Sequence, residues 1–138
     1  PGLHFVATVM VALGTALSTF WIIAANSWMQ TPAGFAVGEG GRLVATDWLQ
    51  VVFNPSFPSR ILHMVSAAYL TTSLAVAGAS AYQLLRRKGH AESRTALKMA
   101  VGLFALLAPA QLMIGHWSGE VVGEHQPLKR AAIEGYWE

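Results

Sequence analysis

Three long stretches without Asp, Glu, Lys or Arg dominate the pattern of polar and apolar positions along the chain. They run from Leu3 to Ala25, from Ile61 to Leu85 and from Met99 to Gly115. A helix that crosses a membrane needs roughly 20 mostly apolar residues. At about 1.5 Å per residue the middle stretch is long enough to span with some tilt. The pattern predicts membrane-spanning helices over residues 2–29, 58–87 and 93–117.

The connecting segments are too short or too polar to span a membrane. From Arg42 to Phe53 the pattern is amphipathic, which predicts a short interfacial helix over residues 42–53. After Trp117 the chain turns polar, and residues 120–138 are predicted to leave the membrane. The expected fold class is therefore an all-α, polytopic membrane helix bundle with three transmembrane helices and a short interfacial helix.

Composition agrees with a membrane protein. Hydrophobic residues make up 54% of the 138 residues and charged residues 12%, which is about half the charged share of a soluble domain. The chain has no cysteine, so disulfides, thiolate catalysis and iron–sulfur clusters are excluded within it. No basic face carries interleaved aromatic side chains, so nucleic acid is not an expected partner. The chain begins at Pro1 without signal-peptide features, and we expect residues 1–138 to be a single membrane segment of a larger subunit.

Basic residues set the expected orientation in the membrane. They gather between the second and third predicted helices, at Arg86, Arg87, Lys88, Arg94 and Lys98. Because short cytoplasmic loops carry an excess of Lys and Arg, the Arg86–Lys98 loop is expected in the cytoplasm. The Thr31–Phe57 loop and the C-terminal segment are then on the outer side.

His63 is the first candidate for chemistry, because an ionisable imidazole at the mouth of an apolar helix needs a partner. No His-x-x-x-His or Glu-x-x-His spacing exists in the chain, so a zinc or di-iron site within one helix is not expected. A single histidine suits an axial ligand of a haem iron, and the small Ser66 and Ala67 follow on its face. The alternative is a histidine that hydrogen-bonds between helices, and spacing alone favours this alternative.

Ser18 and the C-terminal tail are less specific candidates. Ser18 lies on a small-residue face that favours plain helix packing, although its hydroxyl could also serve a water or proton path. In the tail, Arg130 and Glu134 are four residues apart and can pair, whereas Lys129 and Glu134 diverge around a helix. An amphipathic surface helix is the plain interpretation, and a site for a polar head group is the functional one.

Three stretches resemble subunit I of the bacterial cytochrome bd-type quinol oxidases. The first, Gly14–Pro32, contains the distinctive core Trp-Ile-x-x-Ala-Asn-x-Trp-Met-Gln-x-Pro. The second is Asn54-Pro55 followed by His63, and the third is Lys129–Glu134 followed by Tyr136-Trp137-Glu138. The similarity covers essentially the whole chain, and it corresponds to the fourth, fifth and sixth transmembrane helices of that subunit.

The resemblance implies specific roles. His63 matches the histidine that ligates the low-spin haem b558, whose second axial ligand, a methionine, lies outside this chain. Lys129 and Glu134 match the lysine and glutamate implicated in quinol binding and oxidation, in the family's outer quinol-binding loop. Ser18 matches a serine on a polar path toward haem b595 and haem d, whose ligands also lie outside. The implied enzyme is a terminal respiratory oxidase that passes electrons from quinol through these haems and reduces oxygen to water.

The resemblance also implies the surroundings of the chain. These are the bacterial inner (cytoplasmic) membrane, membrane lipid, the remainder of subunit I, subunit II, small accessory subunits and the quinol. The chain alone is expected to be inactive, because half of the haem site is missing. The sequence departs from the family pattern at His116, where some members carry an acid. This change resembles the cyanide-insensitive branch of the family. Two alternatives stay open: a di-haem electron-transfer protein with His63 and His116 as paired ligands, and a non-catalytic helical packing module.

Overall fold

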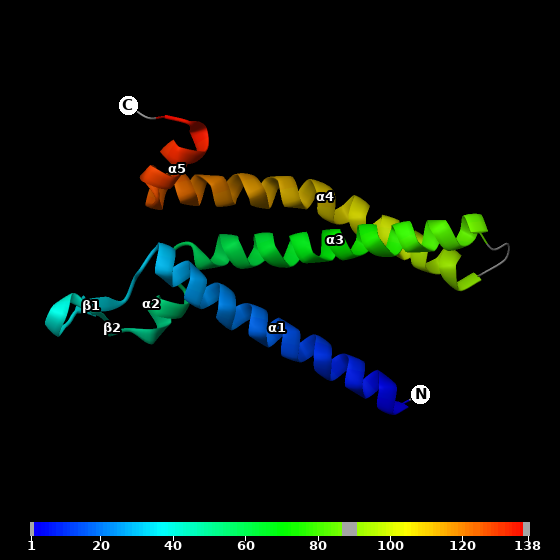
Figure 1. The fold of residues 1–138 in the computed structure, drawn as a ribbon, viewed down its shortest axis with the longest axis horizontal. Coiled ribbons are helices and arrows are strands. Elements are labelled where there is room, and N and C mark those ends of the chain that lie inside the picture. The colour runs from blue at the N-terminus through cyan, green and yellow to red at the C-terminus, as the bar shows by residue number, and fades with distance from the viewer. Residues whose placement is uncertain (1, 87–90, 137–138) are drawn as a thin grey trace. The chain divides into compact units, whose positions relative to one another are not determined.

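Helices account for most of the chain in the computed structural model, which describes residues 2–86 and 91–136. The elements in order are α1 (Gly2–Gln30), β1 (Phe35–Val37), the 3-10 turn η1 (Glu39–Gly41), β2 (Leu43–Ala45), α2 (Trp48–Val52), α3 (Phe57–Arg86), α4 (Ala91–His125) and α5 (Pro127–Glu134) (Figure 1). Among the described residues, α1, α3 and α4 are long and apolar enough to cross a membrane. The predicted all-α membrane class with three spanning helices is therefore confirmed.

The chain divides into two compact units. Unit 1 comprises Pro1–Ile61 and Glu120–Glu138, and unit 2 comprises Leu62–Gly119. Unit 1 therefore holds α1, the two strands, α2, the first turn of α3, the end of α4 and α5. Unit 2 is made of the remaining parts of α3 and α4.

The core of unit 1 forms where the C-terminal half of α1 meets α2 and the start of α3. Its buried and half-buried members are apolar: Phe20, Ile23, Ala24, Val52, Phe57 and Ile61. Phe20 and Phe57 meet edge to face, with ring centroids 5.2 Å apart, an arrangement that aromatic quadrupoles favour. This packing holds the end of α1 beside the start of α3.

The predicted interfacial helix over residues 42–53 is correct only in its second half. Its first half is β2, which pairs antiparallel with β1 so that Phe35 lies opposite Ala45. The carboxylate of Asp47 accepts hydrogen bonds from the backbone N–H groups of Leu49, at 2.9 Å, and Gln50, at 3.3 Å. A side chain that caps the first N–H groups starts a helix, so the helix begins after Asp47 and not at Arg42.

Small side chains line the contact between α3 and α4 in unit 2. Ser66, Ser73 and Ser80 are buried on α3, and Ser93 and Ala100 are buried on α4. On each helix the buried small residues are seven positions apart, a period that keeps them on one face of the helix. We call the two facing rows the seam of small residues. Small residues at such a seam allow helix backbones to approach closely.

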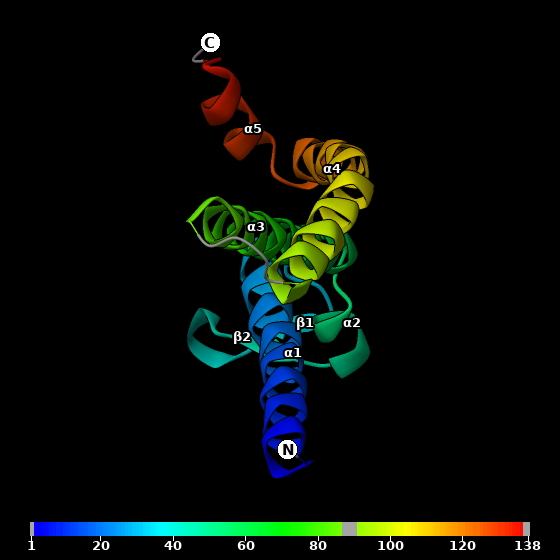
Figure 2. The same cartoon turned by 90° about the vertical axis from the view of Figure 1, so that its right-hand side faces the viewer.

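Helix α4 is longer than the predicted span over residues 93–117, since it begins at Ala91 and continues to His125. Pro109 lies inside it, and the helix changes direction midway in both views (Figures 1 and 2). Proline cannot donate to the preceding turn and commonly bends a helix. The other two spans agree closely with the prediction, although Arg87, at the predicted end of the second, lies outside the described residues.

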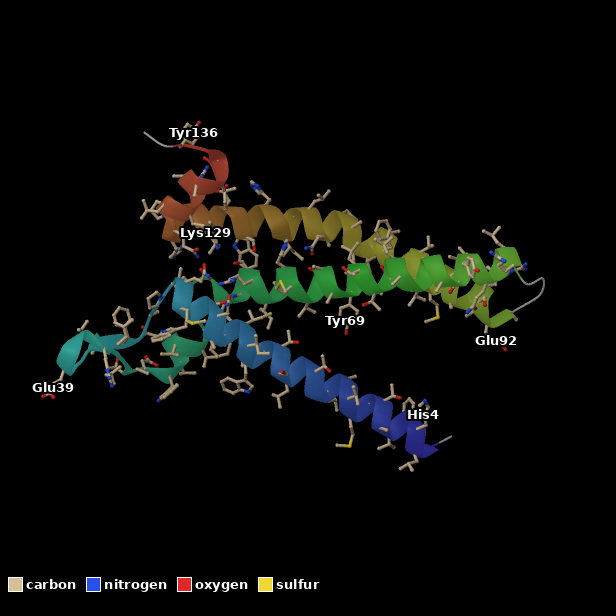
Figure 3. All side chains as sticks on the ribbon, viewed as in Figure 1. His4, Glu39, Tyr69, Glu92, Lys129 and Tyr136 are labelled. Atoms are coloured by element: carbon tan, nitrogen blue, oxygen red, sulfur yellow. The ribbon has the colours of Figure 1, made fainter. Side chains whose placement is uncertain are left out.

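Apolar side chains cover the outside of all three long helices (Figure 3). The most apolar windows of α1, α3 and α4 are 0%, 11% and 6% buried. Exposure of so much apolar surface to water is unfavourable. Lipid or other protein helices must therefore cover these faces.

Candidate functional site

His63 lies near the start of α3, and its imidazole faces α4. A Cβ atom built on Gly115 would lie 3.6 Å from Cε1 of His63, so this glycine stands opposite the ring. One turn earlier on α4, Nε2 of Gln111 lies 3.1 Å from Nδ1 and 3.4 Å from Nε2 of the imidazole. The ring therefore contacts α4 through the edge that carries both of its nitrogen atoms.

Ser66 completes this polar cluster inside unit 2. Its hydroxyl donates to Oε1 of Gln111 and also lies 2.6 Å from the carbonyl oxygen of Leu62. Ser66 is buried and Gln111 is half-buried, which makes an unpaired amide costly at this position. His63, Gln111 and Ser66 thus satisfy one another across the α3–α4 contact.

His116 is not part of this cluster. It follows Gly115, and it is exposed, as are His4 and His125, whereas His63 is half-buried. Neighbouring helical residues point about 100° apart, so His116 cannot share the direction in which Gly115 faces the ring. Within the described part of the chain no hydrogen bond joins His116 to His63. The geometry thus gives no support to a pairing of these two histidines.

The second group of candidates lies on α5 in unit 1. Arg130 Nε donates to Glu134 Oε1 at 2.8 Å, as the four-residue spacing predicts. The hydrogen bond and the charge of Glu134 raise the pKa of the exposed Arg130 guanidinium above its usual value. Lys129 does not share this ion pair. Its Nζ donates to Oε1 of Gln30 at the end of α1, at 3.1 Å (Figure 3).

Local sequence explains why α5 is a separate helix. Pro127 occupies the first turn, where its missing N–H costs nothing. Gly135 ends the helix at φ 73°, in the left-handed region that favours glycine. The N–H of Tyr136 then closes the turn onto the carbonyl of Ala131 at 2.9 Å. Trp137 and Glu138, the last residues of the recognised tail, lie outside the described residues.

Ser18, the candidate for a polar path, is exposed on α1. Its hydroxyl has no hydrogen bond to another described residue. The surface around it is apolar, so the structure leaves this hydroxyl available to groups outside the chain. The proposed path stays a prediction.

The donor chemistry of the described residues fits one axial ligand of a haem. No three His, Asp or Glu side chains gather into a metal cluster within residues 2–86 and 91–136. A haem iron needs only one or two axial side chains, with apolar groups around the ring. His63 offers a half-buried imidazole on an apolar helix, and a single hydrogen bond from Gln111 would leave its second nitrogen free.

Comparison with known proteins decides the family. A family model described as "Cytochrome bd terminal oxidase subunit I" matches residues 1–138. The chain belongs to this family. It is 37% identical over 138 residues to "Cytochrome bd ubiquinol oxidase subunit 1" of Bacillus subtilis, covering 99% of this chain and 29% of that protein. It is also 37% identical over 139 residues to "Cytochrome bd-II ubiquinol oxidase subunit 1" of Escherichia coli, covering 98% of this chain and 26% of that protein.

A solved structure agrees with this assignment. The bd oxidase from Geobacillus thermodenitrificans matches with a TM-score of 0.84 and 31% identity, over 99% of this chain and 32% of that chain. The chain therefore spans less than a third of the length of the two curated relatives named above and about a third of this structure. As a cytochrome bd terminal oxidase subunit I segment with three helices able to span, it is a membrane protein.

The sequence indicated His63, Lys129 and Glu134 as candidates and the pairing of Glu134 with Arg130, but not the partners of His63 and Lys129. Gln111 was visible as a polar residue within an apolar run, and such a residue signals that a hydrogen-bonding partner is nearby. Gln30 lies inside the Trp-Met-Gln-x-Pro core of the family resemblance, and this position already indicated a possible functional role. Both contacts are tertiary, so no local spacing could reveal them.

Proposed function

We propose that this chain forms the part of a cytochrome bd-type quinol:oxygen oxidoreductase that receives electrons from quinol. In the complete enzyme haem b558 would pass these electrons to haems b595 and d, which would supply the reduction of oxygen to water. The relatives named as ubiquinol oxidase subunits support the reaction class. A further relative, 33% identical over 145 residues, is named "Putative cytochrome bd menaquinol oxidase subunit I", so the names of the relatives include both kinds of quinol.

His63 would hold the iron of haem b558, with the second axial ligand supplied by the remainder of subunit I. When bound, the haem supplies one-electron transfer. The chain contributes an imidazole nitrogen, and Gln111 fixes the direction of the ring across the α3–α4 contact. Gly115 lies against the ring, where a Cβ atom would be at contact distance, 3.6 Å from Cε1.

Lys129 and Glu134 would bind the quinol and assist its oxidation. A quinol loses two protons with its two electrons, and a carboxylate such as Glu134 can accept a proton. Arg130 holds that carboxylate in place at 2.8 Å. The ammonium group of Lys129 can donate a hydrogen bond to a quinol oxygen and stabilise the negative charge that develops as the proton leaves. Ser18 would line a polar path toward the oxygen-reducing haems.

The proposed location is the bacterial inner membrane, with the quinol site on its outer side. The basic Arg86–Lys98 connection, whose residues 87–90 lie outside the described part, would face the cytoplasm. The Thr31–Phe57 loop and the C-terminal segment would then face outward. Subunit II, small accessory subunits, lipid and the remainder of subunit I would cover the exposed apolar helix faces.

The observation that carries the proposal is the family match over every residue of the chain, which includes the helix that presents His63. The experiment is a reduced-minus-oxidised spectrum of the full-length oxidase with His63→Ala. We expect the low-spin b-type band to disappear, because the iron loses an axial ligand. His116→Ala is the matched control, since this exposed histidine also lies on a spanning helix. A surviving low-spin band in His63→Ala would refute the ligand assignment.

A further inference from the structure

The amide of Gln111 is placed to control which nitrogen of His63 carries the proton. Neutral histidine has one N–H and one bare nitrogen, and the hydrogen bond made by one nitrogen decides the state of the other. Gln111 Nε2 lies within 3.4 Å of both ring nitrogens. Its partner on the far side of the amide is the hydroxyl of Ser66, which accepts or donates with equal ease.

Two orientations of this amide satisfy the same cluster. In the first, Nε2 of Gln111 donates to the imidazole and lies 3.3 Å from the backbone carbonyl oxygen of His63, while Oε1 accepts from Ser66. In the second, half a turn away, Oε1 accepts the Nδ1 proton of His63 and Nε2 donates to Ser66. The Ser66 proton then goes to the Leu62 carbonyl, which already lies 2.6 Å from the hydroxyl. The second orientation gives up the contact of Gln111 Nε2 with the His63 carbonyl oxygen, but the hydroxyl of Ser66 also lies 3.2 Å from that oxygen, so no buried group is left unpaired.

We propose that Gln111 is a positioning residue for His63: its amide oxygen accepts the Nδ1 proton, and this leaves Nε2 without a proton and able to bind iron. The inference rests on the proposed role of His63 as a haem ligand. Hydrogen bonds of this kind, from the second nitrogen of a ligating histidine, fix the tautomer and the ring direction and raise ligand basicity. A more basic ligand stabilises the ferric state and lowers the reduction potential of the haem.

The test measures the content and the reduction potential of the low-spin b-type haem in the full-length oxidase. Gln111→Leu has nearly the same size but accepts no hydrogen bond, so we expect a higher potential, together with reduced haem content. Gln111→Glu keeps an acceptor oxygen whether it is charged or neutral, so we expect retained haem at a potential no higher than that of the parent. If Gln111 had only a structural role, the reduction potential would not be higher in Gln111→Leu than in Gln111→Glu.

Ser66→Ala and Ser73→Ala form a matched pair. Both serines are buried on the same face of α3, but only Ser66 bonds to Gln111, whereas Ser73 bonds to the Leu70 carbonyl at 2.8 Å. We expect the potential to rise in Ser66→Ala and to stay unchanged in Ser73→Ala.

The outcomes separate this inference from the function on which it rests. Equal potentials in the parent, Gln111→Leu and Gln111→Glu would overturn the role of Gln111, and so would equal shifts in both variants. If Gln111→Leu fails to assemble, the Gln111→Glu protein and the serine pair decide the question. Loss of the band in His63→Ala alongside an unchanged potential in every Gln111 and Ser66 variant would leave the ligand assignment standing and remove only the positioning role. A band that survives His63→Ala would remove both.

Discussion

Lys129 on α5 is hydrogen-bonded to Gln30, the last residue of α1, with 3.1 Å between Nζ and Oε1. The two residues are 99 positions apart in the chain. Each belongs to a separate stretch of the recognised family pattern, so the contact brings two distant motifs into one place within unit 1. Gln30 is therefore a candidate for holding the lysine of the proposed quinol site.

Gln30→Ala should weaken quinol binding, because Lys129 loses the acceptor that fixes its ammonium group. We expect the KM for quinol to rise about two- to fivefold, in keeping with a partly exposed interaction of a charged group. Gln30→Glu is the control, since it keeps an acceptor oxygen at the same reach and should leave KM near the parent value. Steady-state quinol oxidation by the full oxidase gives both constants. An unchanged KM in Gln30→Ala would show that Lys129 is positioned by other groups.

Gly123→Ala should disturb Glu134 through Arg130. A Cβ atom at Gly123 would lie 2.5 Å from Nη1 of Arg130, so the guanidinium must shift and the geometry of its hydrogen bond with Glu134 changes. We expect the kcat for quinol oxidation to fall by about tenfold, because small displacements of groups that transfer protons are costly.

Gly119→Ala is the matched control for this variant. Gly119 lies one turn earlier on α4, and a Cβ atom there would meet nothing within 4 Å. Both variants add one methyl group to the same helix and change its propensity equally. A similar loss of activity in the two proteins would trace the effect to α4 itself and contradict the role given to Arg130.

The long helices were predictable because hydropathy reports the membrane directly. Charge-free runs located α1 and α3, and the predicted bounds placed the end of α1 and the start of α3 within one residue. The end of α4 was missed because its last turns, from Glu120 to His125, are polar yet still helical, and hydropathy marks the end of the apolar run rather than the end of the helix.

The strand pair was missed for a different reason. Residues 43–45 look like the apolar side of an amphipathic helix, and only their pairing with residues 35–37 makes them a strand. Such pairing depends on the geometry of the turn between the strands, which Gly40 and Gly41, both at φ 75°, provide here. The candidate site also depends on tertiary packing. The sequence alone indicated His63, but Gln111, 48 positions away, is its partner only because α3 packs against α4.

Gly34→Ala should destabilise unit 1 around α2. Gly34 has φ 64°, and a Cβ atom there would lie 2.6 Å from the carbonyl oxygen of Asp47. Both the backbone strain and the clash oppose the side chain, so we expect a cost of about 1–3 kcal/mol. Gly40→Ala is the control, because Gly40 also has positive φ but open space around it. Apparent melting temperatures of the assembled oxidase compare the two, and an equal decrease would contradict the predicted clash.

Ser73→Leu should weaken the packing of α3 against α4. Ser73 is 3% exposed and lies in the seam of small residues, where a larger side chain forces the helices apart at a cost of about 1–3 kcal/mol. Thr72→Leu adds a similar side chain to an exposed position on the same helix turn, where lipid or another helix can accommodate it. We expect a reduced yield of assembled, haem-containing oxidase from Ser73→Leu membranes and a normal yield from Thr72→Leu. If Ser73→Leu assembles as well as Thr72→Leu, the seam is not tightly packed in the complete enzyme.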